Sequence, residues 1–478
     1  MGRFYATTTT PYVNADPHIG FALEIIQADV IVRWHKILGD DVVFNTGTDE
    51  HGQKIYDKAK EANMSPKNYC DIYAERFKAL KDALNLHVTN FIRTTDEHHE
   101  KAAQEFWKRC ETNGDIYKKQ YKIRYCVGCE LEKTDSELVD GKCPLHPKQE
   151  LQTYEEENYF FKFSKYQKPL LELYKKHPDF VVPKSKLTEI QTFVKSGLQD
   201  FSISRLKSKM PWGINVPGDS KHVMYVWFDA LINYISTLGW PEDEKNFKNF
   251  WPGVQFAGKD QVRQQAAMWQ AMLLSAKLPP TKQIFIHGFM TVDGQKISKS
   301  LGNVIDPFEV VDKYGTDPLR YYLLAKIHPW EDSDFSWEKF KENYNADLAN
   351  GIGNLVSRVA KLCESTGFTQ MGSESKVSEH VVDVGPYAQA MEQYRFNDAI
   401  TVVIDKVHAL DKFIDTEKPW DLIKKQNPRV KDILSHAVDQ IQEIAGLLEP
   451  FMPETARKIE EQFAGPKISA QAPLFPRL

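Results

Sequence analysis

The sequence predicts an α/β region built on a parallel sheet, a small metal-stabilised insertion within that region, and an all-helical region after it. Three observations lead to this prediction. An apolar run, a long amphipathic segment and a second apolar run follow one another over residues 4–46, which is the pattern of a βαβ crossover. Paired Cys and His residues cluster within residues 126–146. Strand-like runs cease at about residue 337, where helical periodicity takes over.

The elements of the α/β region follow from their apolar patterns. The first helix has an apolar stripe at Ile19, Leu23, Ile26, Val30 and Trp34. In chain order we predict strands at 4–10, 41–46, 91–94, 222–228, 255–258 and 283–287, and helices at about 17–38, 54–62, 97–113 and 261–276. Because strand patterns occur both before and after the cysteine cluster, the cluster lies in an insertion. In the C-terminal region we predict helices at 345–363, 387–416, 431–448 and 454–462.

Length and composition exclude several classes of protein. The 478 residues can hold two or three domains, and 42% hydrophobic with 27% charged residues is typical of a folded globular chain. The net charge of −5 excludes a uniformly basic nucleic-acid coat, so any polynucleotide would bind to a local patch. No apolar run approaches membrane-spanning length and the N-terminus has no apolar signal core, so we expect no membrane association and a cytoplasmic protein.

The cysteine cluster has the spacing of a zinc site. Cys126 and Cys129 are separated by two residues, as are Cys143 and His146, and a Gly-containing turn lies between the two pairs. Four protein ligands would close a tetrahedral site, so we expect one structural Zn²⁺ that stabilises a small domain. A catalytic zinc with an open coordination position is the alternative. Such a cluster favours a reducing compartment over a disulfide framework.

The turn between the first strand and the first helix is a candidate phosphate site. Asp16 and Pro17 start the helix, and His18 and Gly20 lie in its first turn. Backbone donors, the positive end of the helix dipole and an imidazole would converge there on a phosphate chain. The alternative is that His18 only caps the helix.

The loop after the second strand is a further candidate. Asp49 lies in it, at a strand end where parallel sheets bind ligands, and it is either a ligand-binding residue or a turn residue and helix cap.

Residues 296–300, Lys-Ile-Ser-Lys-Ser, form the second candidate phosphate site. The two ammonium groups and two hydroxyls lie on a loop bounded by Gly294 and Gly302. They can follow the charge of a triphosphate from ground state to transition state. A solvated turn is the alternative. Facing the His18 turn across the sheet, this loop would support in-line attack on an α-phosphate with departure of pyrophosphate.

These motifs resemble those of one enzyme family. PHIGF at 17–21 resembles the HIGH element, and KISKS at 296–300 the KMSKS loop, of class I aminoacyl-tRNA synthetases. More narrowly, the chain resembles the methionyl-tRNA synthetases from end to end. The other matching pieces are PYVNA at 11–15, TGTDEHG at 46–52, the Cys/His knuckle, SISR at 202–205, YVWFDA at 225–230, GKD at 258–260 and KPW at 418–420.

The resemblance implies a Rossmann-type catalytic domain with an inserted zinc-knuckle connective domain, followed by an all-α anticodon-binding bundle. The implied boundaries are 1–115 and 221–325 for the two halves of the catalytic domain, 116–220 for the connective insertion, 326–345 for a linker that contacts the tRNA stem and 346–478 for the anticodon-binding domain. Because the chain ends at Leu478 without an appended tRNA-binding or dimerising module, we expect a monomer.

The implied reaction activates L-methionine with ATP and Mg²⁺ to methionyl-adenylate and transfers it to the terminal adenosine of tRNA(Met). ATP would be bound by His18, Gly20, Phe21, Glu24, Gly258, Asp260, His287, Lys296, Ser298 and Lys299, of which His18, Lys296 and Lys299 are catalytic. Methionine would be bound by Thr10, Tyr12, Asp49, Arg205, Trp227, Ala230, Leu231, Tyr234, Gln261 and Gln265. The anticodon would be read by Asn354, Arg358 and Trp420.

The resemblance also implies which part of methionine each residue would bind. Asp49 would take the methionine ammonium, and Arg205 would serve the carboxylate, partly by pairing with Asp49. Trp227, Ala230 and Tyr234 are spaced i, i+3, i+7, so one helical face could present them to the thioether, although core packing is the alternative.

Two departures from the family pattern bear on function. Phe21 replaces the second His of HIGH, which removes an imidazole beside ATP. Gln265 replaces a pocket His and Gln261 an aliphatic residue, which makes the amino-acid site richer in amides. The rival predictions are another class I synthetase, such as a branched-chain or cysteine enzyme, and a synthetase-like RNA-binding protein that has lost catalysis. The small insertion and the complete Cys/His set weigh against the two enzymes.

Overall fold

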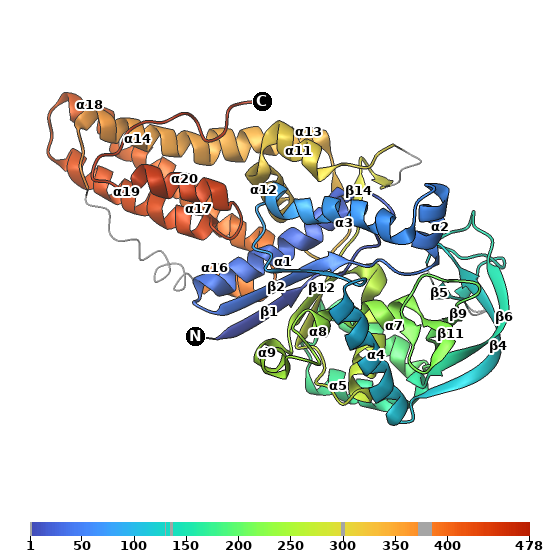
Figure 1. Ribbon diagram of the computed structural model, residues 1–478. Helices are drawn as coiled ribbons and strands as arrows, with labels where there is room; N and C mark the ends of the chain where they lie inside the picture. The colour runs from blue at the N-terminus through green and yellow to red at the C-terminus, as the bar shows by residue number, and fades with distance from the viewer. Residues whose placement is uncertain (1, 130, 134–136, 298–301, 371–384) are drawn as a thin grey trace.

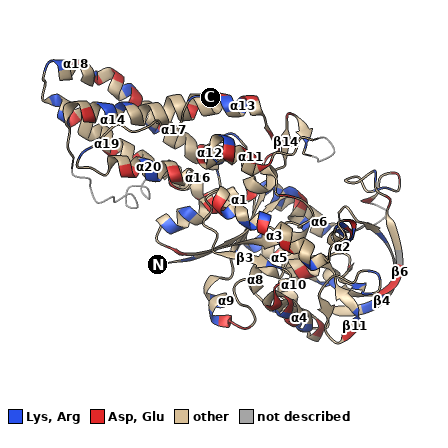
Figure 2. Ribbon diagram, turned by 45° about the horizontal axis from the view of Figure 1, so that its top comes forward, with Lys and Arg blue, Asp and Glu red and all other residues tan. Residues whose placement is uncertain are grey.

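The protein has two lobes in the computed structural model, which describes residues 2–129, 131–133, 137–297, 302–370 and 385–478 (Figure 1). An α/β lobe holds the N-terminal and central residues, and a helical lobe holds the C-terminal residues. Basic and acidic segments are interspersed over both lobes (Figure 2). Among the helices of the described ranges, none is both long and apolar enough to cross a bilayer.

A parallel six-stranded sheet forms the centre of the α/β lobe, with strand order β3-β2-β1-β12-β13-β7. The strands are β1 (Arg3–Thr7), β2 (Asp41–Thr48), β3 (Asn90–Arg93), β7 (Val181–Val182), β12 (Val254–Gly258) and β13 (Gln283–His287). All predicted strands except 222–228 therefore lie in this sheet. Chain order reverses between β1 and β12, which is where doubly wound sheets bind ligands.

The helix α1 (Ile19–Ile37) is buried on all sides rather than amphipathic. It packs on β1, β2 and β12 and also on α12 (Thr316–Ala325), and its residues from Ala22 to Trp34 are all buried. This burial includes the charged side chains Asp29 and Arg33. The helix therefore lies between the sheet and the helical lobe.

A buried ionic network joins the two lobes at α1. Arg320 of α12 donates from Nη2 to Asp29 Oδ2 at 2.7 Å and from Nε to the carbonyl of Phe451 at 2.8 Å. Arg33 donates to the same Asp29 oxygen at 2.8 Å and to Glu449 Oε1 at 3.0 Å. Burial would raise the pKa of Asp29, but the two guanidinium groups outweigh it and hold that pKa below its usual value. The network fixes the helical lobe to the helix that begins at His18.

The prediction of a single strand of the central sheet at 222–228 is wrong. The residues form β11 (Asp219–Met224) followed by α7 (Val226–Ala230), and β11 lies in a separate antiparallel sheet of order β10-β11-β9, with β9 at Ser204–Leu206 and β10 at Asn215–Val216. Both edges of β11 are occupied, so it cannot join the central sheet, which resumes only at β12. The structure also adds β7, from within residues 116–220, to the edge of the central sheet.

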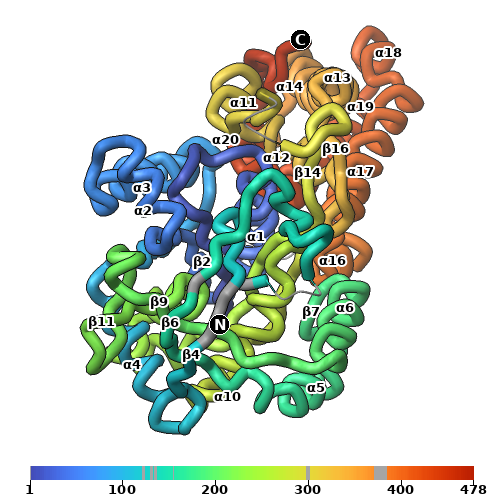
Figure 3. Tube along the Cα trace, turned by 90° about the vertical axis from the view of Figure 1, so that its right-hand side faces the viewer, coloured from blue at the N-terminus to red at the C-terminus, as the bar shows by residue number. Residues whose placement is uncertain are grey.

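The span between the two halves of the sheet contains a second antiparallel sheet of order β5-β4-β6-β8. Its long pair is β4 (Ile116–Cys126) and β6 (Gln152–Phe161), flanked by β5 (Leu131–Glu132) and β8 (Phe201–Ser202). The connection from β4 to β6 carries the Cys/His cluster. In Figures 1 and 3 this connection comes toward the hairpin of β14 (Met290–Val292) and β15 (Gln295–Lys296).

Helices and short elements complete the α/β lobe. They are α2 (Gln53–Glu61), α3 (Pro66–Ala83), α4 (Glu97–Thr112), η2 (Phe163–Tyr166), α5 (Gln167–Lys176), α6 (Lys184–Lys195), α8 (Asn233–Ser236), α9 (Glu244–Phe250), η3 (Lys259–Gln261), η4 (Gln264–Met268), α10 (Trp269–Ser275), α11 (Pro307–Tyr314) and β16 (Ser333–Phe335). The predicted helix at 261–276 is confirmed as one continuous helical segment that runs from η3 through η4 to α10, and η4 is a π-helix turn within it. Such turns occur often at functional sites.

The helical lobe contains the four predicted helical regions. Its elements are α13 (Trp337–Asn343), the π-helix η6 (Tyr344–Gly353), α14 (Asn354–Thr366), α16 (Gly385–Glu392), α17 (Phe396–Glu417), α18 (Pro419–Lys424), α19 (Arg429–Leu448) and α20 (Pro453–Phe463). The predicted helix at 387–416 is broken at Tyr394, whose φ is 56°. Tyr394 packs its ring 5.0 Å from that of Phe285 and donates to Gln283 Oε1 at 2.5 Å, both on β13. Contact with the sheet therefore outweighs helix continuity.

Candidate functional site

The predicted ligand-binding residues converge at the carboxyl edge of the central sheet, around the reversal between β1 and β12. Thr10 follows β1, Asp49 follows β2, Asp260 follows β12, and His287 ends β13. The N-terminus of α1 lies at the same edge, because β1 leads into it. The structure therefore brings residues from four strands to one place.

His18 is the N-cap of α1. Its backbone is extended, and its Nδ1 accepts a hydrogen bond from the Gly20 amide at 3.1 Å. A Cβ at position 20 would lie 3.0 Å from the His18 ring, so a glycine leaves room for this cap. The imidazole is exposed at the edge of the sheet while it caps the helix. The capping and phosphate-binding interpretations are therefore compatible.

Phe21, which replaces the second His of HIGH, makes an apolar contact. Its half-buried ring meets that of Phe77 on α3 edge to face, with centroids 5.5 Å apart. The side chain offers no donor to a phosphate or ribose. Phe21 thus contributes to the packing between α1 and α3.

Glu24 and His287 form a buried pair beneath the helix start. Glu24 accepts from the amide and hydroxyl of Thr9 at 2.8 and 2.6 Å, and its other oxygen lies 2.9 Å from His287 Nε2. His287 Nδ1 lies 2.8 Å from the carbonyl oxygen of Gly288, so Nδ1 donates to it, and Nε2 also donates to Glu24 when the imidazole is protonated. Burial lowers the pKa of His287, but Glu24 outweighs it and raises that pKa. The pair ties α1, β1 and β13 together.

The turn after β12 comes close to the same pair. A Cβ at Gly258 would lie 2.8 Å from Asp260 Oδ1 and 3.5 Å from the His287 ring, so only glycine fits without displacement. Asp260 is exposed. Lys259 pairs with Asp332 and lies over the ring of Phe289, with Nζ 4.4 Å from the centroid.

The β14–β15 hairpin presents Lys296 to solvent. Asp293 and Gly294 form its turn with φ of 49° and 74°. The chain then returns to the helix start, where the Ile19 amide donates to the carbonyl of Ile305 at 3.0 Å. Ser298 and Lys299, the other predicted residues of this loop, lie outside the described residues.

Asp49 occupies the other side of the helix start. It pairs with Tyr12 in an isolated parallel bridge, and its amide donates to the carbonyl of Pro11 at 3.0 Å. Its side chain is buried, whereas Tyr12 and Thr10 are half-buried. Backbone bonds therefore hold the predicted ammonium-binding carboxylate next to the segment that leads into α1.

The predicted apolar residues line two short helices instead of one face of a long helix. Trp227 and Ala230 lie on α7 and Tyr234 on α8, with Leu231 between them. Ala230, Leu231 and Tyr234 are buried, and Trp227 is half-buried. Burial raises the pKa of Tyr234, so its hydroxyl stays neutral.

Gln265 is directed at Tyr234. Its Nε2 donates to the Tyr234 hydroxyl at 2.7 Å and lies 3.4 Å from Gln261 Oε1. Its Oε1 is buried and has no partner among the described residues. The amide thus connects the π-helix η4 to Tyr234 of α8.

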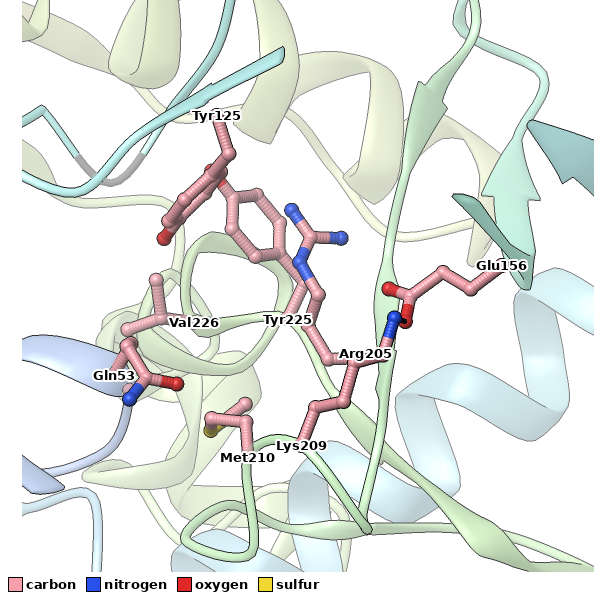
Figure 4. Close-up of a pocket in the computed structure, with 9 residues that line it drawn as sticks. Gln53, Tyr125, Glu156, Arg205, Lys209, Met210, Tyr225 and Val226 are labelled. Atoms are coloured by element: carbon pink, nitrogen blue, oxygen red, sulfur yellow. Dashed lines mark ion pairs between the residues drawn. The ribbon is translucent and has the colours of Figure 1, made fainter. Parts of the chain in front are cut away.

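Arg205 lies close to two aromatic rings in a small pocket (Figure 4). Its guanidinium carbon is 5.2 Å from the Tyr125 centroid and 4.6 Å from that of Tyr225. Nη1 donates to Ser202 Oγ and to the Ser204 carbonyl, both at 2.8 Å. In the same pocket Lys209 pairs with Glu156 at 3.1 Å. The predicted pairing of Arg205 with Asp49 stays a prediction.

The four predicted metal ligands come together. Their ligand atoms all lie within 4.8 Å of one another, with His146 Nδ1 3.2 Å from Cys129 Sγ and 3.7 Å from Cys126 Sγ, and Cys129 Sγ 3.4 Å from Cys143 Sγ. Ligands of tetrahedral zinc are about 3.5 Å apart, given zinc bonds of about 2.0–2.3 Å. Three cysteines and one histidine therefore fit a closed zinc site.

Two of the predicted anticodon residues touch. Arg358 on α14 lies over the Trp420 ring, 5.1 Å from its centroid, and pairs with Asp411 at 2.9 Å and with Asp415. Asn354 is exposed one helical turn before Arg358. The helix α18, which carries Trp420, lies at the far end of the helical lobe from the sheet (Figure 1), and Arg358 contacts it there.

The sequence-based set omitted Glu50, His51, His99 and Asp229, which are all buried beside the amino-acid site. The signal was present for three of them, since Glu50 and His51 belong to the TDEHG segment and Asp229 to YVWFDA. Nothing local marks His99, which reaches the site only through folding of α4.

The sheet reversal, the capped helix start and the lysine hairpin together have the architecture of a class I aminoacyl-tRNA synthetase. A family model described as tRNA synthetases class I (M) matches residues 4–154 and 146–360. A methionine–tRNA ligase of Nostoc sp. is 43% identical over 475 residues, covering 96% of this chain and 89% of the relative. That of Thermotoga maritima is 41% identical, covering 96% of this chain and 74% of the relative.

A solved structure agrees with these relatives. Mycobacterium tuberculosis methionyl-tRNA synthetase in complex with methionyl-adenylate has a TM-score of 0.92 and 33% identity to this chain, with full coverage of both chains. The chain belongs to the methionyl-tRNA synthetase family.

Proposed function

We propose that this chain activates L-methionine with ATP and transfers the methionyl group to the terminal adenosine of tRNA(Met). The observation that carries this proposal is the position of a buried carboxylate, Asp49, and an aromatic and apolar cluster, α7–α8, on one side of the His18-capped helix start. A zwitterionic amino acid with an apolar side chain matches that arrangement. It places the amino-acid carboxylate near the helix start, where an ATP α-phosphate would lie.

Charge complementarity assigns the two ends of methionine. Asp49 would hold the ammonium group, and Arg205 would serve the carboxylate from its place beside Tyr125 and Tyr225. The thioether would contact Trp227, Ala230 and Leu231, with Tyr12, Thr10, Tyr234, Gln261 and Gln265 completing the site. The rings and amides suit a polarizable sulfur.

The phosphate side would use backbone, imidazole and ammonium groups. ATP would lie along His18 and Gly20 with its ribose at Asp260, while Gly258, Phe21, Glu24 and His287 shape the surface below it. A methionine carboxylate oxygen would form the new bond to the α-phosphorus, and the bond to the bridging oxygen of the β-phosphate would break. Lys296, Ser298 and Lys299 would stabilise the departing pyrophosphate. Mg²⁺, which screens phosphate charge when bound, would accompany the nucleotide.

The Cys/His cluster would hold a structural Zn²⁺. Cys126, Cys129, Cys143 and His146 would supply all four ligands of a tetrahedral ion, which would leave no open position for a substrate. The metal would stabilise the β4–β6 connection, which buries little apolar surface of its own.

The helical lobe would bind the anticodon of tRNA(Met). Trp420 would stack on an unpaired base, and Asn354 and Arg358 would form hydrogen bonds to base edges. Asp411 and Asp415 already orient the guanidinium. The domain boundaries given above, a monomeric state and a cytoplasmic location belong to the same proposal.

Amino-acid-dependent ATP–pyrophosphate exchange tests the proposed reaction. We expect methionine to stimulate exchange and no other proteinogenic amino acid to approach it. Stimulation by a different amino acid would overturn the specificity. Binding of tRNA(Met) without exchange would instead support an RNA-binding protein that has lost catalysis.

A further inference from the structure

The loop that carries Asp49 is anchored on one side through its neighbour Glu50. The Glu50 carboxylate accepts from Arg93 Nε at 2.7 Å and Nη2 at 2.9 Å, and from Thr48 Oγ1 at 2.7 Å. Its amide donates to Thr94 Oγ1 at 2.9 Å. These bonds attach the loop to the end of β3.

The same loop is anchored on the opposite side through His51. His51 Nδ1 lies 2.7 Å from Asp229 Oδ2 on α7, and the other oxygen of Asp229 lies 2.9 Å from His99 Nε2 on α4. His99 Nδ1 in turn lies 2.9 Å from Ser236 Oγ on α8. All four side chains are buried. A single carboxylate therefore links the Asp49 loop to three helices.

This link is ionic as well as hydrogen-bonded. Burial lowers the pKa of His51, but the Asp229 carboxylate outweighs that effect and raises the pKa above its ordinary value. Burial raises the pKa of Asp229, and His51 outweighs it in the opposite direction. Glu50 and Glu100 add negative potential at His51. Charge-assisted hydrogen bonds of this kind are short and directional.

The two ends of the link coincide with the two ends of the amino-acid site. His51 is two residues from Asp49, the proposed ammonium ligand. Asp229 lies between Trp227 and Ala230, which would contact the side chain. The alternative is a buried pair that stabilises the fold without positioning the substrate-binding groups. In that case, substitution of the pair would lower the stability of the fold and would change the KM values of methionine and ATP alike.

We propose that His51, Asp229 and His99 form a positioning triad that sets the separation between the Asp49 carboxylate and the α7–α8 cluster. The triad touches no substrate. It acts by holding the two walls of the amino-acid site at the spacing that methionine spans from ammonium to thioether. This inference rests on the proposed function, because it takes Asp49 and α7–α8 as the methionine-binding groups.

The experiment compares three purified full-length variants in ATP–pyrophosphate exchange. His51→Ala removes the donor to Asp229, and His51→Asn keeps a donor near the position of Nδ1. His35→Ala is the matched control, since His35 Nδ1 also meets a carboxylate, Asp40 at 2.8 Å, at the opposite edge of the sheet. Ser236→Ala, which removes only the outer partner of His99, is a milder variant if His51→Ala does not fold.

We expect His51→Ala to raise the KM for methionine roughly tenfold, the loss expected for one charge-assisted bond, with the KM for ATP changed less than about twofold. His51→Asn should recover most of that loss, Ser236→Ala should shift the methionine KM in the same direction by a smaller factor, and His35→Ala should leave both constants unchanged. Equal changes in the two KM values, or no recovery by Asn, would overturn the positioning role.

A parallel measurement on Asp49→Asn separates failure of the triad from failure of the proposed site. If Asp49→Asn raises the methionine KM and the His51 variants do not, the site holds and the triad is wrong. If Asp49→Asn leaves the methionine KM unchanged, the assignment of the site itself is wrong and the triad fails with it.

Discussion

The two sides of the helix start at His18 are built differently, although both lie at one edge of one sheet. The amino-acid side is closed by buried groups: Asp49, Tyr234 and Gln265 are each 3% exposed or less. The phosphate side presents exposed groups, namely His18, Asp260 and Lys296. The difference suits the ligands proposed for the two sides. An apolar side chain is distinguished by shape and by burial, whereas phosphate charge is bound by donors that can remain in contact with water.

The two sides also differ in their buried imidazole–carboxylate pairs. On the proposed phosphate side, Glu24 and His287 join α1 to two strands beneath the helix start. On the proposed amino-acid side, His51 and Asp229 join the Asp49 loop to the surrounding helices. The first pair supports the surface on which ATP is proposed to lie. The second pair fixes the walls of the proposed methionine site. We therefore expect substitutions on the two sides to separate in their effects on methionine and ATP.

Asp49→Asn should have the largest effect. It removes the only charge proposed for the ammonium group, and loss of a buried ion-pair partner costs about 2–5 kcal/mol, or roughly 30- to 5,000-fold in affinity. We expect the methionine KM in pyrophosphate exchange to rise by at least that lower factor while the ATP KM is nearly unchanged. A comparable rise in the ATP KM would mean that the two sides are not separable.

Lys296→Ala should come next and should act on the rate. An interaction made mainly with departing pyrophosphate stabilises the transition state, so kcat should fall about 10- to 100-fold with both KM values nearly constant. Lys458→Ala, at an exposed lysine of α20 paired with Glu454, is the control and should leave exchange unchanged. A rise in the ATP KM without a fall in kcat would assign Lys296 to ground-state binding.

Arg358→Ala should affect neither side of the helix start. The residue lies in the helical lobe, so pyrophosphate exchange should not change, whereas charging of tRNA(Met) should fall about tenfold from loss of one base contact and of the Trp420 stack. Aminoacylation and exchange assays on the same preparation check this. Equal loss in both assays would show that the substitution acts through the lobe interface at Asp29 and Arg320.

Removal of zinc with a chelator should affect the amino-acid side more than the phosphate side. Cys126 directly follows Tyr125, whose ring lies over Arg205, so loosening of the metal site would disturb the residue that serves the methionine carboxylate. We expect a lower melting temperature and a severalfold rise in the methionine KM, both restored by added Zn²⁺. A rise confined to the ATP KM would contradict this coupling.

The smallest expected effect is the pH dependence of stability. The folded pKa values of His51 and His287 are both raised above an unfolded value of about 6.5, so their contributions are full below that pH and are lost as the pH rises through the folded values. The melting temperature should therefore decline gently from pH ~6 to ~8. His287→Gln should remove the contribution of His287 to that decline, and His51→Asn should remove the contribution of His51. A decline that neither substitution changes would assign it to other groups.

Most elements of the fold could be predicted from local patterns, and the exceptions have identifiable causes. The strand at 222–228 had the right apolar character, but its hydrogen-bonding edges are taken by β9 and β10. The helix at 387–416 had continuous periodicity, but Tyr394 is drawn to the sheet by Phe285 and Gln283. In both cases contacts between distant residues outweigh a local preference.

The candidate site divides in the same way. The metal ligands and the helix-start motif are short in sequence, because two-residue spacings and a capped first turn are local geometries. The sequence by itself therefore determined the parallel-sheet class, the Cys/His cluster and the positions of the candidate phosphate-binding motifs. Only the tertiary structure decided that His51 meets Asp229, 178 residues away, and that Gln265 is directed at Tyr234. Such pairs are set by how helices pack on the sheet, and no local pattern encodes that packing.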